Sequence, residues 1–274
     1  MALKRPPDGI LYACAVLGFV ALAIVEQERA NAPAAPPPIA EGPGLGPTAA
    51  MRPSTVRKLA RAARERATGT AFSVSDSGVW LTARHVVNGC RRAAVLVSPS
   101  RGVEAKVSSD PATDVAVLAT DGGAPPLPLA PSGGLKSGLR GYHPGFPQGA
   151  PGEVTSRLVG PYRLRRPGRG EPAQAVLAWA EVGRTDGLKG RLSGLSGAPV
   201  LDGEGRVIGV TLAESPRRGR IYAAPPAAIQ VALTRARLAP ASFAEGRSIN
   251  RGNYGRVADA LRRDLRIAPV ACLD

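Results

Sequence analysis

The sequence predicts an all-β fold built as two small barrels packed together. Across residues 69–235 no long helical periodicity occurs, and short apolar runs alternate instead with glycine, proline and aspartate. This pattern is typical of strands joined by tight turns. Short strands at this spacing form sandwiches or barrels, and the length of the region suits two barrels. The hydrophobic share of the 274-residue chain, 44%, is ordinary and sufficient for a packed core.

The chain begins with a segment that we expect to enter a membrane. Lys4 and Arg5 precede residues 9–25, which carry no charge, at a length that fits either a short spanning helix or a long signal-peptide core. Residues 30–32 resemble a cleavage site, but the proline that follows them disfavours cleavage. We therefore expect a retained anchor, with residues 1–8 in the cytoplasm and the remainder of the chain outside it.

Residues 26–66 are expected to connect this anchor to the folded domain. Residues 31–48 are rich in proline and alanine, which favours an extended, semi-rigid spacer. Residues 51–66 have a helical composition and many basic side chains, so we expect a basic lead-in helix there. A folded domain is then expected over residues 67–240, followed by a tail over 241–274.

The clearest local feature is a β-hairpin at the start of this domain. Residues 70–74 and 79–82 predict two strands, and the polar run Ser75-Asp76-Ser77-Gly78 between them is typical of a tight turn. Further apolar runs predict strands at residues 93–97, 103–107, 115–119, 175–182 and 206–212.

The tail contains one amphipathic segment, residues 253–266, with Val257, Leu261 and Leu265 on one side. We expect a short helix that packs on the second barrel, the alternative being a helix that docks a partner.

Two of the three cysteines could pair if the domain lies in an oxidising compartment. Of the three cysteines, Cys14 lies in the hydrophobic segment, which leaves Cys90 and Cys272 as a potential disulfide, although sequence alone does not establish that they approach each other. With two histidines in the chain and no paired-cysteine spacing, we expect no metal site.

Three residue types that act together in hydrolysis stand beside predicted strands. His85 follows the hairpin, Asp114 directly precedes the strand at 115–119, and Ser196 lies in the glycine-rich stretch GLSGAPVLDG. Each alone has an ordinary structural explanation, as a strand-end histidine, a turn cap or a serine in a glycine turn. The other histidine, His143, stands next to Pro144 in a stretch that predicts a loop, so we expect a structural or rim residue there.

The order His, Asp, Ser excludes two other hydrolase classes. An α/β-hydrolase needs its histidine after the serine, and no histidine follows residue 143. A subtilisin-like order needs an acid before His85, for which Asp76 is the nearest candidate. Asp76 sits in the hairpin turn, however, and the strand–helix alternation of that fold is missing.

Several segments resemble those of the trypsin-like serine proteases, most closely the bacterial HtrA/Deg type, over about residues 68–235. In the family's order they are GTAFSVSDSGVWLTARHVV, TDVAVL, GFPQGAPGEVTSRLVG, LSGAPVLDGEGRVIGV and IYAAPPAAI. The resemblance implies two packed six-stranded antiparallel β-barrels with the active site between them and no cofactor or metal. The residues after 240 are too few for the PDZ domain often attached to this family, so we expect none.

The resemblance also implies a role for each candidate residue. Serine is a weak nucleophile unless a base removes its proton, and His85 is the natural base for Ser196. Asp114 would fix the tautomer of the histidine and stabilise the imidazolium. The oxyanion hole of the family maps to the backbone N–H groups of Gly194 and Ser196.

Substrate recognition is implied at a strand edge. The family adds an extended peptide to the strand that maps to Leu212, Ala213 and Glu214. The wall of the side-chain pocket maps near Gly190 and residues 222–224, whose small and apolar residues indicate small aliphatic side chains before the scissile bond.

The sequence thus predicts a serine endopeptidase that is anchored in the bacterial inner membrane and cleaves polypeptides in the periplasm. The alternative is a catalytically silent protease fold that binds polypeptides or polyanionic envelope partners, which a net charge of +15 would favour. The basic residues are scattered and no nucleic-acid motif occurs, so we expect no specific nucleic-acid partner.

Overall fold

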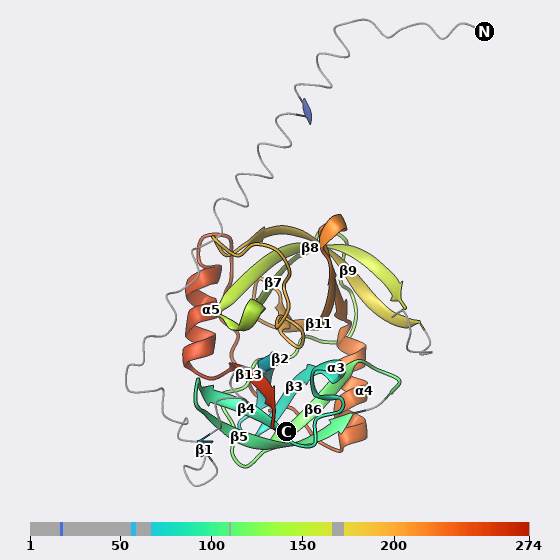
Figure 1. Cartoon of the computed structure of the whole chain (residues 1–274). Coiled ribbons are helices and arrows are strands. Elements are labelled where there is room, and N and C mark those ends of the chain that lie inside the picture. The colour runs from blue at the N-terminus through green and yellow to red at the C-terminus, as the bar shows by residue number, and fades with distance from the viewer. Residues whose placement is uncertain (1–16, 19–55, 59–66, 110, 166–172, 274) are drawn as a thin grey trace, which may run out of the picture.

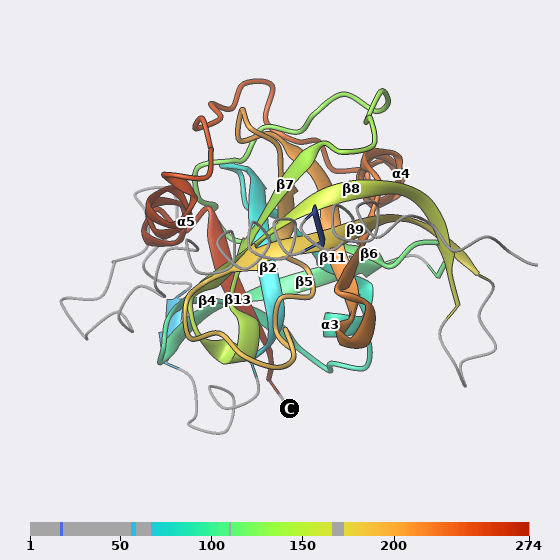
Figure 2. The same cartoon turned by 90° about the horizontal axis from the view of Figure 1, so that it is seen from above.

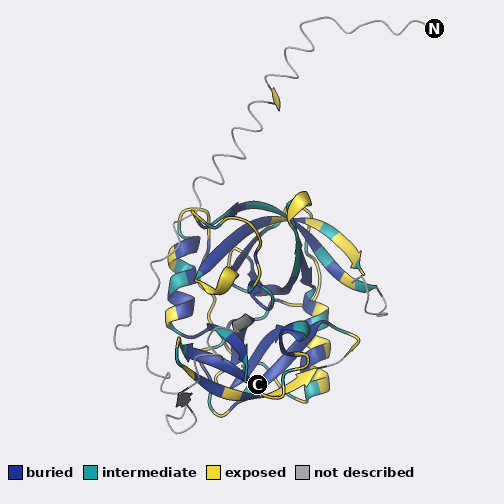
Figure 3. Cartoon of the chain, viewed as in Figure 1, coloured by how far each residue is buried: buried dark blue, intermediate teal, exposed yellow. Residues whose placement is uncertain are grey.

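The computed structural model describes residues 17–18, 56–58, 67–109, 111–165 and 173–273 of the chain. These residues form two closed antiparallel β-barrels, one above the other in Figure 1, and the predicted fold of two six-stranded barrels is confirmed. Figure 3 shows that most strand residues within the two barrels are buried, while exposed residues lie on turns, on α4 and on the far end of the β8–β9 hairpin.

The first barrel is a ring of six strands, closed by pairing between the strand at residues 101–109 and the strand at residues 115–120. Its strands follow each other around the ring in the order β5-β4-β13-β2-β3-β6, and β5 also pairs with β6. Their bounds are β2 Ala67–Ser75, β3 Val79–Ala83, β4 Ala93–Ser98, β5 Arg101–Ser109, β6 Val115–Thr120 and β13 Ile267–Cys272. Fully buried Phe72, Trp80, Leu81 and Leu118 belong to its core. The predicted hairpin is confirmed, because β2 and β3 pair in the register Phe72↔Leu81.

The second barrel has the ring order β10-β11-β12-β9-β8-β7. Its strands are β7 Arg140–Gly145, β8 Gly152–Leu164, β9 Gln174–Arg184, β10 Pro199–Leu201, β11 Val207–Ser215 and β12 Arg220–Ala224. Figure 2 shows β8 and β9 continuing beyond the barrel as a long hairpin. Trp179 and Ile221 are buried in a second apolar cluster.

Short helices connect or cover these strands. They are α3 Arg84–Val87, the 3-10 turns η2 Pro147–Gly149 and η3 Pro216–Arg218, and the two longer helices α4 Pro226–Ala236 and α5 Tyr254–Arg263. Helix α5 contacts β7 and β8 of the second barrel, where the sequence predicts a helix. Among the described residues, no helix has the length and apolar character needed to cross a membrane. The predicted membrane segment, residues 9–25, lies outside the described residues apart from Leu17 and Gly18.

The end of the chain supplies a strand to the first barrel. Strand β13 lies between β4 and β2, so the expectation of a helical tail separate from the domain was wrong for residues 267–272. Pro269 weakens the strand pattern in the sequence, because a proline lacks the N–H that a central strand needs. Pro269 pairs with Thr70 of β2, whereas the pairing with β4 begins only at Val270. The missing donor is therefore tolerated at the start of the second ladder.

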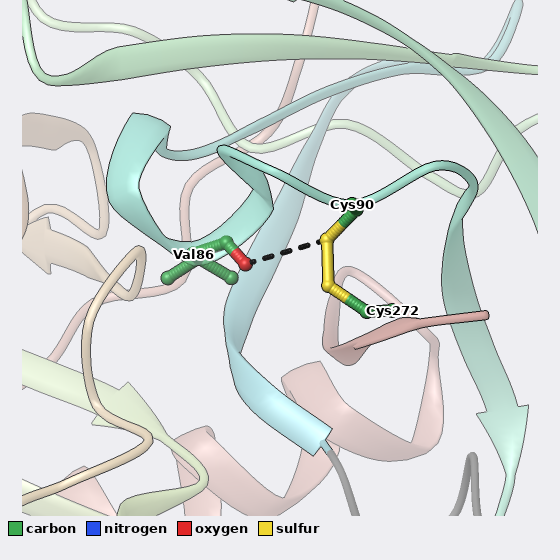
Figure 4. Close-up of a disulfide and its surroundings, with 3 residues drawn as sticks. All are labelled: Val86, Cys90 and Cys272. Carbon is green, nitrogen blue, oxygen red and sulfur yellow. Dashed lines mark hydrogen bonds between the residues drawn. A yellow bond between two sulfur atoms is a disulfide. The ribbon is translucent and has the colours of Figure 1, made fainter. Parts of the chain in front are cut away.

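A disulfide fastens this last strand to the first barrel. Cys90 and Cys272 are bonded, with their Cα atoms 5.3 Å apart, which confirms the potential pairing. Figure 4 shows the bond beside Val86, whose carbonyl oxygen lies 3.8 Å from Cys90 Sγ. Cys90 lies three residues after the end of α3, so the bridge ties the segment after α3 to strand β13.

A basic helix was expected over residues 51–66, and the three described residues there disagree with it. Residues Val56–Lys58 form strand β1, which pairs antiparallel with β5 in the register Val56↔Val103. A short isolated helix is marginal in water, whereas an open strand edge offers backbone partners at once. The remainder of the expected helix and the Pro/Ala-rich spacer lie outside the described residues.

Helix α5 is fixed to the second barrel by a buried ion pair. Arg262 Nη2 lies 3.0 Å from Glu153 Oε2 and 2.7 Å from Asp259 Oδ1. Its Nη1 donates to the carbonyl oxygens of Gly145 and Gly152, both at 3.3 Å, so one guanidinium joins the two ends of the loop between β7 and β8. Burial raises the pKa of Glu153 to about 7, against the opposing effect of Arg262.

Candidate active site

His85 and Asp114 are brought together by strand pairing. The end of β3 and the start of β6 are antiparallel neighbours, with Ala83 opposite Val115. His85 follows the first strand and Asp114 precedes the second, so their side chains meet although they are far apart in sequence. Asp114 Oδ2 lies 2.8 Å from His85 Nδ1, and Asp114 Oδ1 accepts the backbone N–H of His85 at 3.0 Å.

This contact leaves the histidine accessible and the carboxylate enclosed. The side chain of His85 is 21% exposed, whereas that of Asp114 is 3% exposed. An ionised carboxylate only accepts hydrogen bonds, so Nδ1 of His85 carries the proton and the lone pair of the neutral ring is on Nε2. The imidazole therefore has its basic nitrogen on the side away from Asp114.

Ser196 lies where the two barrels meet. Its carbonyl oxygen accepts the N–H of Thr70 in the first barrel at 2.8 Å, and its Oγ lies 3.4 Å from the carbonyl oxygen of Leu212 in the second. Gly197 has φ +87°, and a Cβ there would overlap Thr70 O and lie 2.9 Å from Ala83 N, the residue before α3. This close approach needs glycine and places Ser196 beside the helix that carries His85.

The turn before Ser196 is held by a residue that sequence reasoning missed. Thr70 Oγ1 donates to the carbonyl oxygen of Gly194 at 2.8 Å and accepts the N–H of Phe146 at 3.1 Å. Gly194 has φ +95°, and a Cβ on it would lie 2.5 Å from Phe146 O. Within the described part of the chain, the N–H groups of Gly194 and Ser196 donate to no acceptor. Both donors are thus available to a ligand.

A cavity of about 160 Å³ opens beside Ser196. Its lining is mainly apolar, with Leu192, Leu195, Ala213 and Ile221, and includes Glu214. Of the predicted substrate-binding residues, Ala213 and Glu214 line this cavity, and Leu212 contributes its carbonyl oxygen next to Ser196 Oγ. The predicted wall at residues 222–224 does not line it. In the described ranges, no group of three or more His, Cys, Asp and Glu side chains could hold a metal ion.

His143 is buried in β7, so the expectation of a loop position for it was wrong. Its Nδ1 lies 3.0 Å from Thr211 Oγ1 and its Nε2 lies 2.7 Å from Ser156 Oγ. With no exposed surface and both ring nitrogens engaged, it has a structural role. The glycines and the proline of Arg140–Gly145 are typical of a loop in the sequence, although these residues form strand β7, which pairs with β8 along its whole length.

Burial of His143 predicts a loss of stability in acid. Burial lowers its pKa from 6.5 to about 3, so the unfolded chain binds more protons and the contribution of His143 to stability falls as the pH drops below about 6.5. Between pH 7 and pH 5 the loss is about 2 kcal/mol. We expect the difference in unfolding free energy between the wild type and His143→Gln, measured by urea denaturation, to shrink by this amount.

Because the wild type and His143→Gln share all other titrating groups, the contributions of those groups cancel in the difference between the two unfolding free energies. Glu153 acts in the opposite sense, because its raised pKa stabilises the folded state as the pH falls from about 7. It is present in both proteins and cancels. A difference that stays constant between the two pH values contradicts the prediction.

Two closed antiparallel β-barrels, with a histidine–aspartate pair on the first and a serine that contacts both, are the arrangement of double-barrel peptidases. Residues 69–210, just over half of the chain, match the trypsin-like peptidase domain family, and the chain belongs to this family.

Curated relatives carry protease names. The chain is 31% identical over 149 residues to a putative serine protease HhoA of Synechocystis, an alignment that covers 53% of this chain and 36% of the relative. It is 29% identical over 249 residues to a probable periplasmic serine endoprotease, DegP-like, of Pseudomonas savastanoi, covering 89% of this chain and 48% of the relative. The chain thus spans between a third and a half of the length of these relatives.

A solved structure shows the same fold. The active form of the Rv3671c protease from M. tuberculosis aligns with a TM-score of 0.54 and 23% sequence identity, over 80% of this chain and 94% of that chain.

Proposed function

We propose that this protein is a serine endopeptidase that cleaves polypeptides through an acyl-enzyme on Ser196. Membership in the trypsin-like peptidase family and the protease names of its relatives support this function. The observation that carries it is the contact of His85 with both oxygens of Asp114, beside the loop of Ser196. That contact fixes the ring and its tautomer, which a general base requires.

In the first half of the reaction, Ser196 Oγ attacks the carbonyl carbon of the scissile bond while His85 Nε2 takes its proton. Asp114 stabilises the resulting imidazolium and keeps its own charge. The carbonyl electron pair moves to oxygen, and the N–H groups of Gly194 and Ser196 bind the oxyanion. Each such donor is worth about 10²- to 10³-fold in rate.

In the second half, the imidazolium returns its proton to the leaving amine and the carbon–nitrogen bond breaks, which leaves an ester on Ser196. Water then attacks this ester, with His85 again as base, and the carboxylic acid product and free serine are restored. The open edge of β11 at residues 212–214 would hold the peptide in an extended conformation during both steps.

We also propose that residues 9–25 anchor the domain in the inner membrane and that the domain works in the periplasm. The apolar segment behind Lys4 and Arg5 supports the anchor. The disulfide Cys90–Cys272 is of a kind that persists in oxidising compartments, and one relative is named as periplasmic.

Covalent labelling tests this function. The full chain, purified in detergent, is treated with a fluorophosphonate probe, and the modified residue is located by mass spectrometry. We expect the label on Ser196, and we expect Ser196→Ala and His85→Ala to remove it. No label at all when peptides are present contradicts the proposed function and favours a binding module, whereas a label on the neighbouring Ser193 contradicts the assignment of Ser196 as the nucleophile.

A further inference from the structure

A second hollow adjoins the cavity beside Ser196. It measures about 510 Å³, and Gly190, Arg191, Ser215, Pro216 and Arg217 line it together with Glu214. Glu214 lines both hollows, so they share a wall at the end of β11. A peptide with a side chain in the first hollow therefore lies beside the second hollow.

The second hollow is positively charged. Arg191 and Arg217 are exposed, and neither has an ion-pair partner in the part of the chain that the structure describes. The carboxylate in the lining, that of Glu214, already accepts the N–H of Leu192 at 2.9 Å. Two arginines and one glutamate thus line the hollow, and the carboxylate of the glutamate is already engaged by the backbone, which favours an anionic ligand.

The backbone that carries both arginines is fixed in place. Gln148 Nε2 donates to the carbonyl oxygen of Arg191 at 2.8 Å, and Arg184 Nη1 donates to that of Gly190 at 3.0 Å. On the other side, the turn that holds Arg217 is closed by the N–H of Gly219, which donates to Pro216 O at 3.2 Å. Anchored turns lower the entropy cost of ordering the arginines around a ligand.

Strand geometry indicates which substrate residue reaches this hollow. Residues 213–215 pair with β12 on one side, whereas β10 pairs only with residues 207–210, so the other edge is unpaired among the described residues. A peptide added antiparallel there, with the residue before the scissile bond opposite Leu212, has its third residue before that bond opposite Glu214. Alternate residues of a strand lie on the same side, so this third residue lies on the same side as the residue before the scissile bond. Its position opposite Glu214 places it next to Ser215–Arg217, which line the second hollow.

We propose that Arg191 and Arg217 form a subsite for an acidic side chain, Asp or Glu, at the third position before the scissile bond. This inference rests on the proposed peptidase function. It assigns to the protein a preference for polypeptides that carry an acid two residues ahead of the residue in the apolar cavity.

Three quenched fluorescent peptides test the subsite. They are identical except for Glu, Gln or Lys at the third position before the scissile bond, and kcat/KM is measured for each. A charge-assisted hydrogen bond predicts about a tenfold preference for Glu over Gln, with Lys poorer still. The double variant Arg191→Gln/Arg217→Gln should bring the Glu-to-Gln ratio to about one, and Arg217→Glu should reverse the order of Glu and Lys.

A matched control separates this local effect from the net charge of the protein. Arg256→Gln/Arg263→Gln removes the same charge from exposed positions on α5, which contacts β7 and β8. The control should keep the wild-type ratio. An equal loss in the control, or an unchanged ratio in the Arg191/Arg217 variant, overturns the subsite.

A binding measurement separates failure of the subsite from failure of the peptidase function. Ser196→Ala cannot form the acyl-enzyme, and its affinity for the same peptides is read by fluorescence anisotropy. Tighter binding of the Glu peptide, lost on removal of Arg191 and Arg217, supports the subsite even without turnover. Ser196 labelling with equal affinity for all three peptides overturns the subsite and leaves the peptidase function intact.

Discussion

Replacement of Asp114 by asparagine is expected to lower kcat/KM for peptide hydrolysis by about 10⁴-fold without unfolding the protein. The carboxylate makes two contacts with His85, one to the backbone N–H and one to Nδ1. An asparagine keeps its carbonyl oxygen on the backbone N–H, so its amide N–H₂ must face Nδ1. The proton of the imidazole then moves to Nε2, and the ring loses the lone pair that accepts the serine proton.

The measurement compares kcat/KM and the rate of fluorophosphonate labelling in the wild type, Asp114→Asn and a matched control. Asp76→Asn makes the same chemical change in the exposed turn of the first hairpin and should leave both rates unchanged. Urea unfolding shows whether Asp114→Asn stays folded. A folded variant that retains more than about a tenth of the wild-type rate is incompatible with Asp114 acting through His85.

Deletion of residues 264–274 is expected to abolish cooperative folding. It removes β13, whose residues Ile267, Ala268, Val270 and Ala271 have no exposed surface. Burial of the isoleucine and the valine alone is worth about 1.5–3 kcal/mol each. The deletion also leaves β2 and β4 without their shared neighbour. Together, the lost burial and the lost strand pairing approach the net stability of an ordinary domain, which is about 5–15 kcal/mol.

The deletion should also disorder the candidate active site. In β13, Val270 and Pro269 lie opposite Gly69 and Thr70, and Thr70 holds both the Gly194 and the Ser196 carbonyl groups. We expect no soluble protein with a cooperative urea transition and no labelling of Ser196. A truncated chain that unfolds cooperatively and labels at the wild-type rate would falsify the role of β13 in closing the barrel.

Two graded controls isolate the strand from its cross-link. Cys90→Ser/Cys272→Ser keeps β13 and removes the disulfide, which should lower stability by about 2–5 kcal/mol because the bridge closes a long loop. Deletion of residues 273–274 alone keeps both the strand and the bridge and should have little effect. The ordering of these three variants by urea midpoint separates strand pairing from covalent closure.

The sequence predicts much of the first barrel because its signals are local. The hairpin at residues 70–82 shows a polar turn between apolar runs, and this signal lies within one short segment of the chain. Strand β13 carries no such signal. It contains a proline, and its partners β2 and β4 lie far away in sequence, so its pairing depends on an opening that exists only after the barrel has assembled.

The site shows the same division. The residue types and order of His85, Asp114 and Ser196 are visible in the chain, and they predict a hydrolase of one class. The contacts of Thr70 and the proposed role of Arg191 are not visible, because a threonine in a strand and an arginine in a loop are ordinary residues. Thr70 acts through Gly194 and Phe146, which only the junction of the two barrels brings to it.

By itself the sequence determined the all-β class, the chemistry of three candidate residues and the two cysteines able to pair, since each of these is a property of short segments and residue types. The tertiary structure alone decided that His85 reaches Asp114, that His143 is enclosed, and that the last strand closes the first barrel. These three features depend on strand pairing and burial between segments that are distant in sequence, and a local sequence pattern does not reveal the free energy of such contacts.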